Sequence, residues 1–298
     1  MKVKMIRSLL TICLLAGMLT LCSGCAGTVS GNTVAATTLP VYEFTQWLCQ
    51  GTDITVTQLI TESVSCLHDY TLQVTQMRAI ESAQAVVVSG AGLEDFLDSA
   101  TSHSAMIDAS FGIELLCGDH HEDEHSRESG HSHENDPHIW LSPTNAKRMA
   151  QNISARLTEH FPEHSETFIA NLQTLSEKLD ALKAYGTEQL SKLSCREMIT
   201  FHDGFSYFAE AFGLTILYTV EEESGSEASA AELKELISLV NQHQLPAIFT
   251  EENGSTSAAS VIAAETGVPV FKLSMAMSGE SYFDAMYHNI DTLKEALG

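Results

Sequence analysis

Residues 198–208 read Met-Ile-Thr-Phe-His-Asp-Gly-Phe-Ser-Tyr-Phe, a short apolar segment that ends in His-Asp-Gly and then becomes aromatic. An apolar run with a β-branched residue predicts a buried strand, and the polar end predicts a turn into a helix that carries Phe205, Phe208 and Phe212. Open α/β sheets bind ligands at the carboxyl ends of their strands. His202 therefore falls where a ligand-binding side chain is expected.

Short apolar segments alternate with helical segments on both sides of this stretch. Strands are predicted to begin at Thr33, Ile54, Ala85 and Ala105 in the first half, and at Met198, Thr215, Ala247 and Val270 in the second. Ser229 and Glu232 have the spacing of a capping box at the start of a helix. Strands that alternate with helices predict βαβ units, so we expect α/β domains with parallel sheets.

Residues 163–193 separate the two halves and predict one long helix. The apolar residues Phe168, Leu172, Leu175, Leu179 and Leu182 recur at spacings of three and four, which is typical of a helix that lies on a core. Such a helix spans about 45 Å, enough to cross two domains. A dimeric coiled coil is the alternative, but the apolar stripe is short and Gly186 interrupts it.

Two more histidines occupy settings like that of His202. His68 lies in Cys-Leu-His-Asp-Tyr, ahead of a predicted helix, and His138 lies in Asp-Pro-His-Ile-Trp-Leu-Ser-Pro. The three are 70 (138−68) and 64 (202−138) residues apart, so only the fold could bring them together. Neutral imidazole is the commonest metal ligand in proteins, and three imidazoles suit zinc. Ordinary helix-cap or surface roles remain open for each of them.

Residues 1–24 have the pattern of a secretory signal peptide. Three basic residues precede an apolar run from Leu9 to Leu21, and small residues follow. The small pair before Cys25 is similar to a bacterial lipobox, so we expect Cys25 to be the lipidated first residue of the mature protein. Residues 25–33 would then be a tether, with plain secretion as the alternative.

The charge of the chain limits its partners. The whole chain has 15 basic and 39 acidic residues, and the signal peptide takes three of the basic ones, which leaves 12 − 39 = −27. This balance argues against binding to nucleic acid and against a polybasic patch that would bind a membrane surface. It suits a protein that binds cations.

The mature chain has four cysteines beyond Cys25. They are Cys49, Cys66, Cys117 and Cys195. Four cysteines outside the cytosol allow three disulfide pairings, among which the sequence does not choose, and free buried thiols are the alternative. Cys66 is also a conceivable soft metal ligand, since it lies two residues before His68.

Residues 119–135 break the alternating pattern. This segment holds five of the 13 histidines, interleaved with carboxylates and almost without apolar residues: His120, His121, His125, His131 and His133. Its composition predicts a mobile loop that collects metal more weakly than a structured site. A solvated insertion without a metal role is the alternative.

The segments around His68, His138 and His202 resemble, in order, the ligand segments of metal-binding solute-binding proteins of ABC transporters, the zinc and manganese uptake class. Residues 249–252, Phe-Thr-Glu-Glu, and the tail 282–293 are similar too. The resemblance runs from about Val34 to the C-terminus. It implies two βα domains with parallel sheets, joined by one long rigid linker helix, with the metal site in the cleft between the domains. The expected boundaries are 34–160, 161–193 and 194–298.

The resemblance also indicates which metal is bound. Manganese members of the family usually place a carboxylate where this chain has His202, and histidine nitrogen favours zinc. The family usually supplies a fourth ligand as an aspartate after the last strand, where this chain has Ser274. Serine is a poor zinc ligand, so water, Glu251 or Glu280 is expected to fill that position. A manganese-specific protein of the same family is the alternative.

The implied function is capture of Zn²⁺ outside the membrane and its delivery to an ABC permease driven by a cytoplasmic ATPase. We expect a monomer with no nucleic-acid partner, anchored by lipid to the outer face of the bacterial cytoplasmic membrane or periplasmic. A secreted zinc hydrolase is an alternative, because three histidines and a water also form catalytic sites. The chain lacks the His-Glu-x-x-His segment of zinc proteases, and an adhesin is a weaker possibility.

Overall fold

The structure is a computed structural model that describes residues 32–62, 67, 70–97, 105–117, 135–220, 228–252, 254–279 and 281–298. Several predictions from the sequence fall outside these ranges: the signal peptide and Cys25, Cys66 and His68, the five histidines of the 119–135 segment, and Glu280. None of the helices within the described ranges combines the length and the apolar character needed to cross a membrane.

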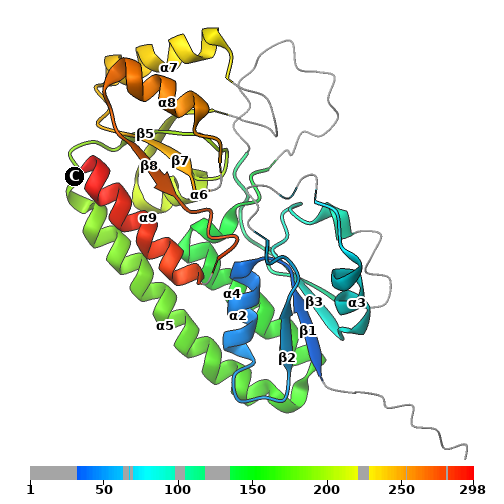
Figure 1. Cartoon of the computed structure of the whole chain (residues 1–298). Coiled ribbons are helices and arrows are strands. Elements are labelled where there is room, and N and C mark those ends of the chain that lie inside the picture. Colours follow the sequence, from blue (N-terminus) through cyan, green and yellow to red (C-terminus); the bar gives the residue numbers. More distant parts are fainter. Residues whose placement is uncertain are drawn as a thin grey trace, which may run out of the picture. The chain divides into compact units, whose positions relative to one another are not determined.

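The first half of the chain forms a four-stranded parallel sheet with the order β2-β1-β3-β4 (Figure 1). Its strands are β1 (Thr33–Ala36), β2 (Thr55–Gln58), β3 (Ala85–Val88) and β4 (Ala105–Asp108), and its helices are α2 (Leu39–Leu48), α3 (Val74–Ser82) and the short η1 (Asp95–Leu97). β3 is buried along its whole length, as an Ala-Val-Val-Val segment at the centre of a covered parallel sheet should be. β2, at one edge, is exposed on alternate residues.

The second half forms another four-stranded parallel sheet with the order β6-β5-β7-β8. Its strands are β5 (Glu197–Thr200), β6 (Thr215–Thr219), β7 (Ile248–Glu251) and β8 (Val270–Leu273), and its helices are α6 (Ser206–Phe212), α7 (Ala230–His243), α8 (Ser257–Thr266) and α9 (Tyr282–Leu297). The capping box predicted at Ser229 and Glu232 is present at the start of α7. Two α/β domains with parallel sheets are therefore confirmed.

A long helical segment runs between the two sheets, as predicted. It consists of the short turn η3 (Pro162–His164), α5 (Ser165–Gln189) and the short turn η4 (Leu190–Lys192), so the α-helix itself is shorter than residues 163–193. Tighter 3₁₀ turns at both ends account for the difference. α5 packs on α2 and on α4 (Pro143–His160) in the first domain and on α9 in the second.

Gly186 lies inside α5, where the sequence suggested only an interruption of the apolar stripe. A Cβ atom at this position would lie 2.3 Å from Phe212 Cε1 and 3.0 Å from Ile290 Cδ1. Glycine therefore allows α5 to approach the second domain closely. The interruption is a packing requirement, and the helix continues through it.

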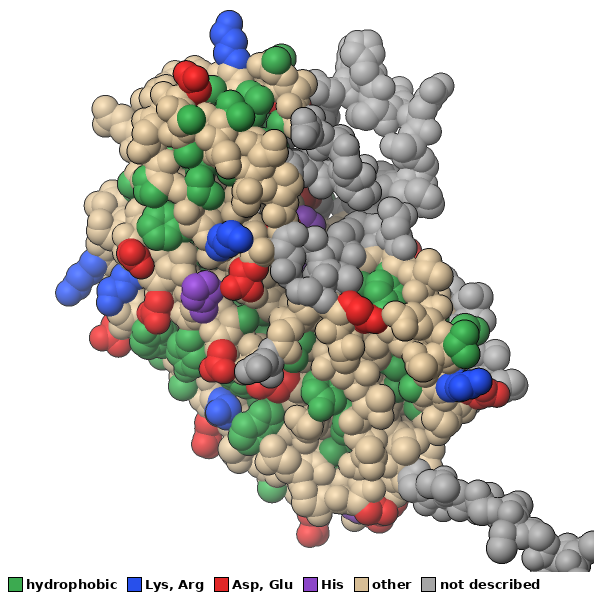
Figure 2. All heavy atoms as spheres, viewed as in Figure 1, with side chains coloured by type: hydrophobic (Ala, Val, Ile, Leu, Met, Phe, Trp, Pro, Cys, Tyr) green, Lys and Arg blue, Asp and Glu red, His purple; other side chains and the backbone are tan. Residues whose placement is uncertain are grey.

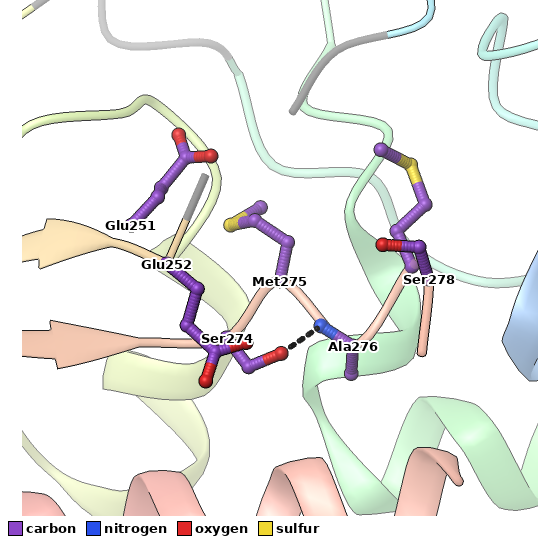
Figure 3. A pocket seen from close by; sticks show the side chains of 7 residues that line it. Glu251, Glu252, Ser274, Met275, Ala276 and Ser278 are labelled. Atoms are coloured by element: carbon purple, nitrogen blue, oxygen red, sulfur yellow. Dashed lines mark hydrogen bonds between the residues drawn. The ribbon is translucent and has the colours of Figure 1, made fainter. Parts of the chain in front are cut away.

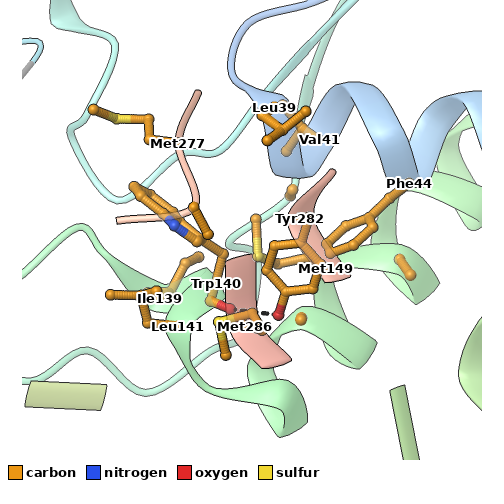
Figure 4. Packing of buried hydrophobic residues seen from close by; sticks show 14 of the residues in the cluster. Leu39, Val41, Phe44, Ile139, Trp140, Leu141, Met149, Met277, Tyr282 and Met286 are labelled. Atoms are coloured by element: carbon orange, nitrogen blue, oxygen red, sulfur yellow. Dashed lines mark hydrogen bonds between the residues drawn. The ribbon is translucent and has the colours of Figure 1, made fainter. Parts of the chain in front are cut away.

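A core of aromatic and methionine side chains lies where η2 (Ile139–Leu141), α2 and α9 meet (Figure 4). The rings of Phe44 and Tyr282 meet edge to face at 5.0 Å, and the Tyr282 hydroxyl donates to Trp140 O at 2.8 Å. Trp140 Nε1 in turn donates to Met275 O at 2.8 Å. These contacts tie the segment that follows His138 to the connection between β8 and α9.

The acidic side chains of one face of the molecule are spread over both domains. Figure 2 shows the Asp and Glu side chains of this face separated from one another rather than collected in one patch. On this face, therefore, the net negative charge does not by itself point to a binding site.

Candidate metal centre

His138 and His202 lie side by side where the two domains meet. His138 directly precedes η2 in the first domain, and His202 lies two residues beyond the end of β5 in the second. Their ring centroids are 5.3 Å apart, and the ring planes are nearly perpendicular at 82°. The fold thus brings together two histidines that are far apart in the sequence, one from each domain.

Each imidazole is hydrogen-bonded through Nδ1 to a buried carboxylate. His138 Nδ1 lies 2.8 Å from Asp136 Oδ1, and His202 Nδ1 lies 2.9 Å from Glu251 Oε1. The side chains of Asp136 and Glu251 are 1% and 5% exposed. An ionised carboxylate only accepts hydrogen bonds, so each Nδ1 carries a proton, and when the imidazole is neutral its lone pair is on Nε2. Metal-binding histidines usually have this second partner, which fixes the tautomer and the ring orientation.

The nitrogen that would bind a metal in His202 is buried and unused. Among the residues that the structure describes, His202 Nε2 has no hydrogen-bond partner. A buried polar atom without a partner costs free energy, which a bound metal ion would recover. The donor set therefore fits a cation such as zinc.

The carboxylates also set the charge of His202. Burial alone would lower the pKa of its imidazole, but the hydrogen bond and the charge of Glu251, with the charges of Asp203 and Asp136, raise the pKa above its usual value. These carboxylates favour positive charge at the imidazole in the absence of metal. The same negative charge favours a divalent cation at this place.

Asp136 is fixed by local geometry as well as by the imidazole. Its Oδ1 also accepts the backbone N–H of His138 at 2.8 Å, across Pro137. An aspartate that binds the backbone two residues ahead forms an Asx turn, and the intervening proline restricts the chain further. The segment Asp-Pro-His contains the signal for this turn, although no role for Asp136 was predicted from the sequence.

Gly204 allows the two domains to touch at the site. A Cβ atom on Gly204 would lie 2.4 Å from Met275 Cε and 3.0 Å from His138 Nδ1. The turn that follows His202 therefore packs directly on the imidazole of the other domain. The Gly in His-Asp-Gly has a packing reason that the sequence alone did not reveal.

Ser274 directs its hydroxyl group into the local backbone. Its Oγ accepts a hydrogen bond from Ala276 N at 3.2 Å (Figure 3). The side-chain amide of Asn289 binds both the backbone N and the backbone O of Ser274 at 2.7 Å. The segment 274–278 lines a small pocket together with Glu251 and Glu252. Glu251 contacts His202 at Nδ1 and leaves Nε2 without a partner among the described residues, which favours an orienting role for Glu251 over direct ligation.

The described residues supply two imidazoles and two carboxylates, but not a complete ligand set. Within these ranges, no group of three or more His, Cys, Asp or Glu side chains converges closely enough to hold a metal ion. His68 and Glu280, the other predicted donors, are not among the residues that the structure describes. Cys49, Cys117 and Cys195 are free thiols. Burial raises the pKa of the Cys49 thiol to about 12, so this thiol is unsuited to bind metal.

The architecture is that of a two-domain solute-binding protein. It has two α/β domains, a long helix that connects them, and one imidazole from each domain at their junction. Residues 34–296 match the family described as ZnuA, zinc-uptake complex component A, periplasmic, and the chain belongs to this family. The resemblance predicted from the sequence is thereby confirmed.

Curated relatives are similar over most of this chain. It is 30% identical over 303 residues to the zinc-binding lipoprotein AdcA of Streptococcus pneumoniae serotype 4. The matched region covers 97% of this chain and 60% of that protein. The zinc-binding proteins AdcA of Streptococcus pyogenes are 32% identical, with 55% of their length covered. The chain thus spans little more than half the length of these relatives. The high-affinity zinc uptake system protein ZnuA of Bacillus subtilis is 30% identical, with 89% of this chain and 87% of that protein covered.

Solved structures show the same fold. A crystal structure of ZnuA superposes with a TM-score of 0.76 at 27% identity and covers 90% of this chain and 100% of that one. The metal-dependent lipoprotein YcdH of Bacillus subtilis gives a TM-score of 0.75 at 28% identity, with coverage of 89% and 99%. The predicted architecture therefore agrees with experimental structures.

Proposed function

We propose that this protein binds one Zn²⁺ between its two domains and delivers it to the permease of an ABC importer. The observation that carries the proposal is the pair of imidazoles from different domains, each with Nδ1 held by a buried carboxylate. Relatives named as zinc-binding and zinc-uptake proteins support zinc as the cargo.

In this proposal His68, His138 and His202 are the direct ligands. Asp136 and Glu251 hold His138 and His202 in the tautomer that presents Nε2, and their negative charge offsets that of the cation. Nitrogen ligands favour zinc over manganese, which prefers oxygen. The fourth position is proposed for water or Glu280, and Glu251 as a direct ligand is the less favoured arrangement.

The division of ligands between domains suggests how zinc is released. His138 belongs to the first domain and His202 to the second, so moving the domains apart separates two ligands. A partner that changes the distance between the domains therefore lowers the affinity for zinc. We propose that the permease is this partner, with a cytoplasmic ATPase on another chain supplying the free energy.

The remaining parts of the proposal concern location and the accessory segment. We propose a monomer outside the cytoplasm, anchored by lipid on Cys25 after removal of residues 1–24, with domains at 34–160 and 194–298 and a linker helix at 161–193. The histidine-rich segment is proposed to collect zinc more weakly. The family is described as a periplasmic component of a zinc-uptake complex, which is a binding role rather than catalysis.

A zinc titration of purified residues 26–298, with metal analysis of the untreated protein, tests this proposal. We expect one tightly bound zinc per chain and zinc as the main metal in the untreated protein. Manganese as the main native metal, or the absence of a tight site, would contradict it.

A further inference from the structure

We propose that Tyr207 is a positioning residue of the zinc site, because its hydroxyl fixes the segment that carries Asp136 and His138 onto the second domain. The inference rests on the proposed function for its effect on zinc. Tyr207 belongs to α6, five residues beyond His202, and its side chain is buried.

The hydroxyl of Tyr207 uses both of its hydrogen-bonding capacities across the domain junction. It accepts the backbone N–H of Leu116 at 2.9 Å and donates to the backbone O of Asp136 at 3.0 Å. Burial raises the pKa of Tyr207 to about 12, so the hydroxyl keeps its proton under ordinary conditions. One side chain of the second domain thus binds two backbone groups of the first.

These two backbone groups belong to neighbouring chain segments. Asp136 N donates to Leu116 O at 2.8 Å, and Cys117 and Asn135 form an isolated antiparallel bridge. Leu116 and Asp136 therefore lie side by side although 20 residues (136−116) separate them. The hydroxyl of Tyr207 adds two bonds to this pair and holds both segments on α6.

The position of Asp136 determines the position of His138. Asp136 Oδ1 accepts both the backbone N and the imidazole Nδ1 of His138 at 2.8 Å. A shift of the Asp136 backbone would therefore carry the carboxylate and the imidazole with it. Tyr207 lies on the helix that follows His202. Its hydroxyl therefore helps to fix the position of the His138 imidazole relative to that of His202.

A purely structural role for Tyr207 makes different predictions. Removing the hydroxyl leaves two buried backbone groups without that partner, which lowers stability in either case. A structural role would leave the zinc affinity of the folded protein and the tautomer of His138 unchanged. A positioning role changes both, and changes them through Asp136.

The test is a double-mutant cycle in residues 26–298 with Tyr207→Phe and Asp136→Asn. Zinc affinity is measured by competition with a chelator, the His138 tautomer by ¹⁵N NMR of the metal-free protein, and the melting temperature by circular dichroism. We expect Tyr207→Phe to weaken zinc binding about 10-fold and Asp136→Asn by about 10–100-fold. The double variant should lose less than the product of the two, because both changes act on one contact chain.

Tyr185→Phe is the matched control. It removes a hydroxyl that donates to Asp291 at 2.6 Å, in a hydrogen bond between α5 and α9 that involves neither the two imidazoles nor their carboxylates. Its zinc affinity should stay unchanged. The inference is overturned if Tyr207→Phe lowers only the melting temperature, or if the two site variants lose affinity independently.

The NMR measurement separates this inference from the proposed function. If the wild-type protein binds no zinc tightly, the proposed function fails. The inference still stands or falls on whether Tyr207→Phe disturbs the Nδ1-protonated tautomer of His138 in the metal-free protein. An unchanged tautomer together with unchanged stability would contradict any role of the hydroxyl.

Discussion

Among the residues that the structure describes, four histidines lie 2.7–2.9 Å from a carboxylate oxygen, and two of these pairs differ from the other two. His138 with Asp136 and His202 with Glu251 lie at the domain junction, with carboxylates that are at most 5% exposed. His164 with Asp53 and His243 with Glu197 have similar distances of 2.7 and 2.9 Å, but their carboxylates are 69% and 41% exposed. The comparison shows that the same imidazole–carboxylate contact occurs in a buried and in an exposed setting, and only the buried pairs are part of the proposed metal site.

The two kinds of pair differ in the burial of the carboxylate, and only the two buried pairs lie next to each other. Exposed ion pairs contribute little, because water solvates both partners in the absence of the contact. The buried pairs lose that solvation. Their two imidazoles lie next to each other, with ring centroids 5.3 Å apart. A cation at the junction recovers what burial costs, whereas a cation near an exposed pair gains little over water.

The largest effect is expected when an imidazole of the junction is removed. His202→Ala or His138→Ala removes a proposed zinc ligand and should weaken zinc binding by more than about 100-fold, beyond what is typical for supporting groups. His243→Ala is the matched control, since it breaks the exposed contact with Glu197, and it should leave the affinity unchanged. Calorimetry measures the zinc affinity of the three variants and of the wild-type protein. Equal affinities would remove the distinction between the two kinds of pair.

A smaller loss is expected when only the supporting carboxylate is changed. Glu251→Gln keeps the size of the side chain but no longer fixes the protonated Nδ1 of His202 through a charge, and it should weaken zinc binding by about 10–100-fold. Glu197→Gln is the control at the exposed pair and should have no effect on affinity. A chelator competition assay measures both. A loss as large as that of His202→Ala would instead indicate that Glu251 is itself a ligand.

Glu94 is a buried carboxyl group that has no imidazole as its partner among the residues that the structure describes. Glu94 accepts hydrogen bonds from Thr37 Oγ1, Ser89 N and Gly90 N, and burial raises its pKa from 4.5 to about 7. The folded state thus holds a proton that the unfolded state loses, so stability is fully present below pH 4.5 and falls as the pH rises towards 7.

Glu94→Gln removes this dependence. Between pH 5 and 7 the wild-type free energy of unfolding should fall by about 1–2 kcal/mol more than that of the variant. Urea unfolding of the metal-free protein at several pH values measures the two slopes. Parallel slopes would show that the carboxyl group of Glu94 is ionised throughout, like an exposed carboxylate.

The smallest effect on the tight site is expected from deleting residues 120–133, which carry the five histidines of the 119–135 segment. The composition of this segment predicts residues that a bound metal would have to order, at about 1–2 kcal/mol per residue, so these histidines should bind more weakly than imidazoles held by buried carboxylates. A zinc titration should show the first zinc unchanged and the weaker, additional binding lost. A large loss of affinity for the first zinc would mean that this segment supplies a ligand to the junction.

The sequence predicted the elements of the fold better than the contacts of the site. Apolar runs and the His-Asp-Gly turn placed β5 and α6 within a residue or two, because local patterns govern such elements. The long linker helix followed from its apolar spacing, while its 3₁₀ ends did not, since tertiary contacts decide how a helix ends.

The partners of the imidazoles could be predicted only in part. Asp136 lies two residues before His138, and the Asp-Pro-His turn was readable in principle. Glu251 was noticed as a carboxylate at a strand end, but its contact with Nδ1 of His202 depends on the pairing of β5 with β7. Tyr207 had no signal at all, because its hydroxyl binds backbone groups 91 and 71 residues away.

X-ray absorption at the zinc edge, on residues 26–298 loaded with one zinc per chain, tests directly whether the imidazoles hold the metal. We expect histidine nitrogens at about 2.0–2.1 Å as the main ligands, with at least one fewer nitrogen in His202→Ala. A zinc environment of oxygen atoms alone, or a spectrum that His202→Ala leaves unchanged, would contradict it.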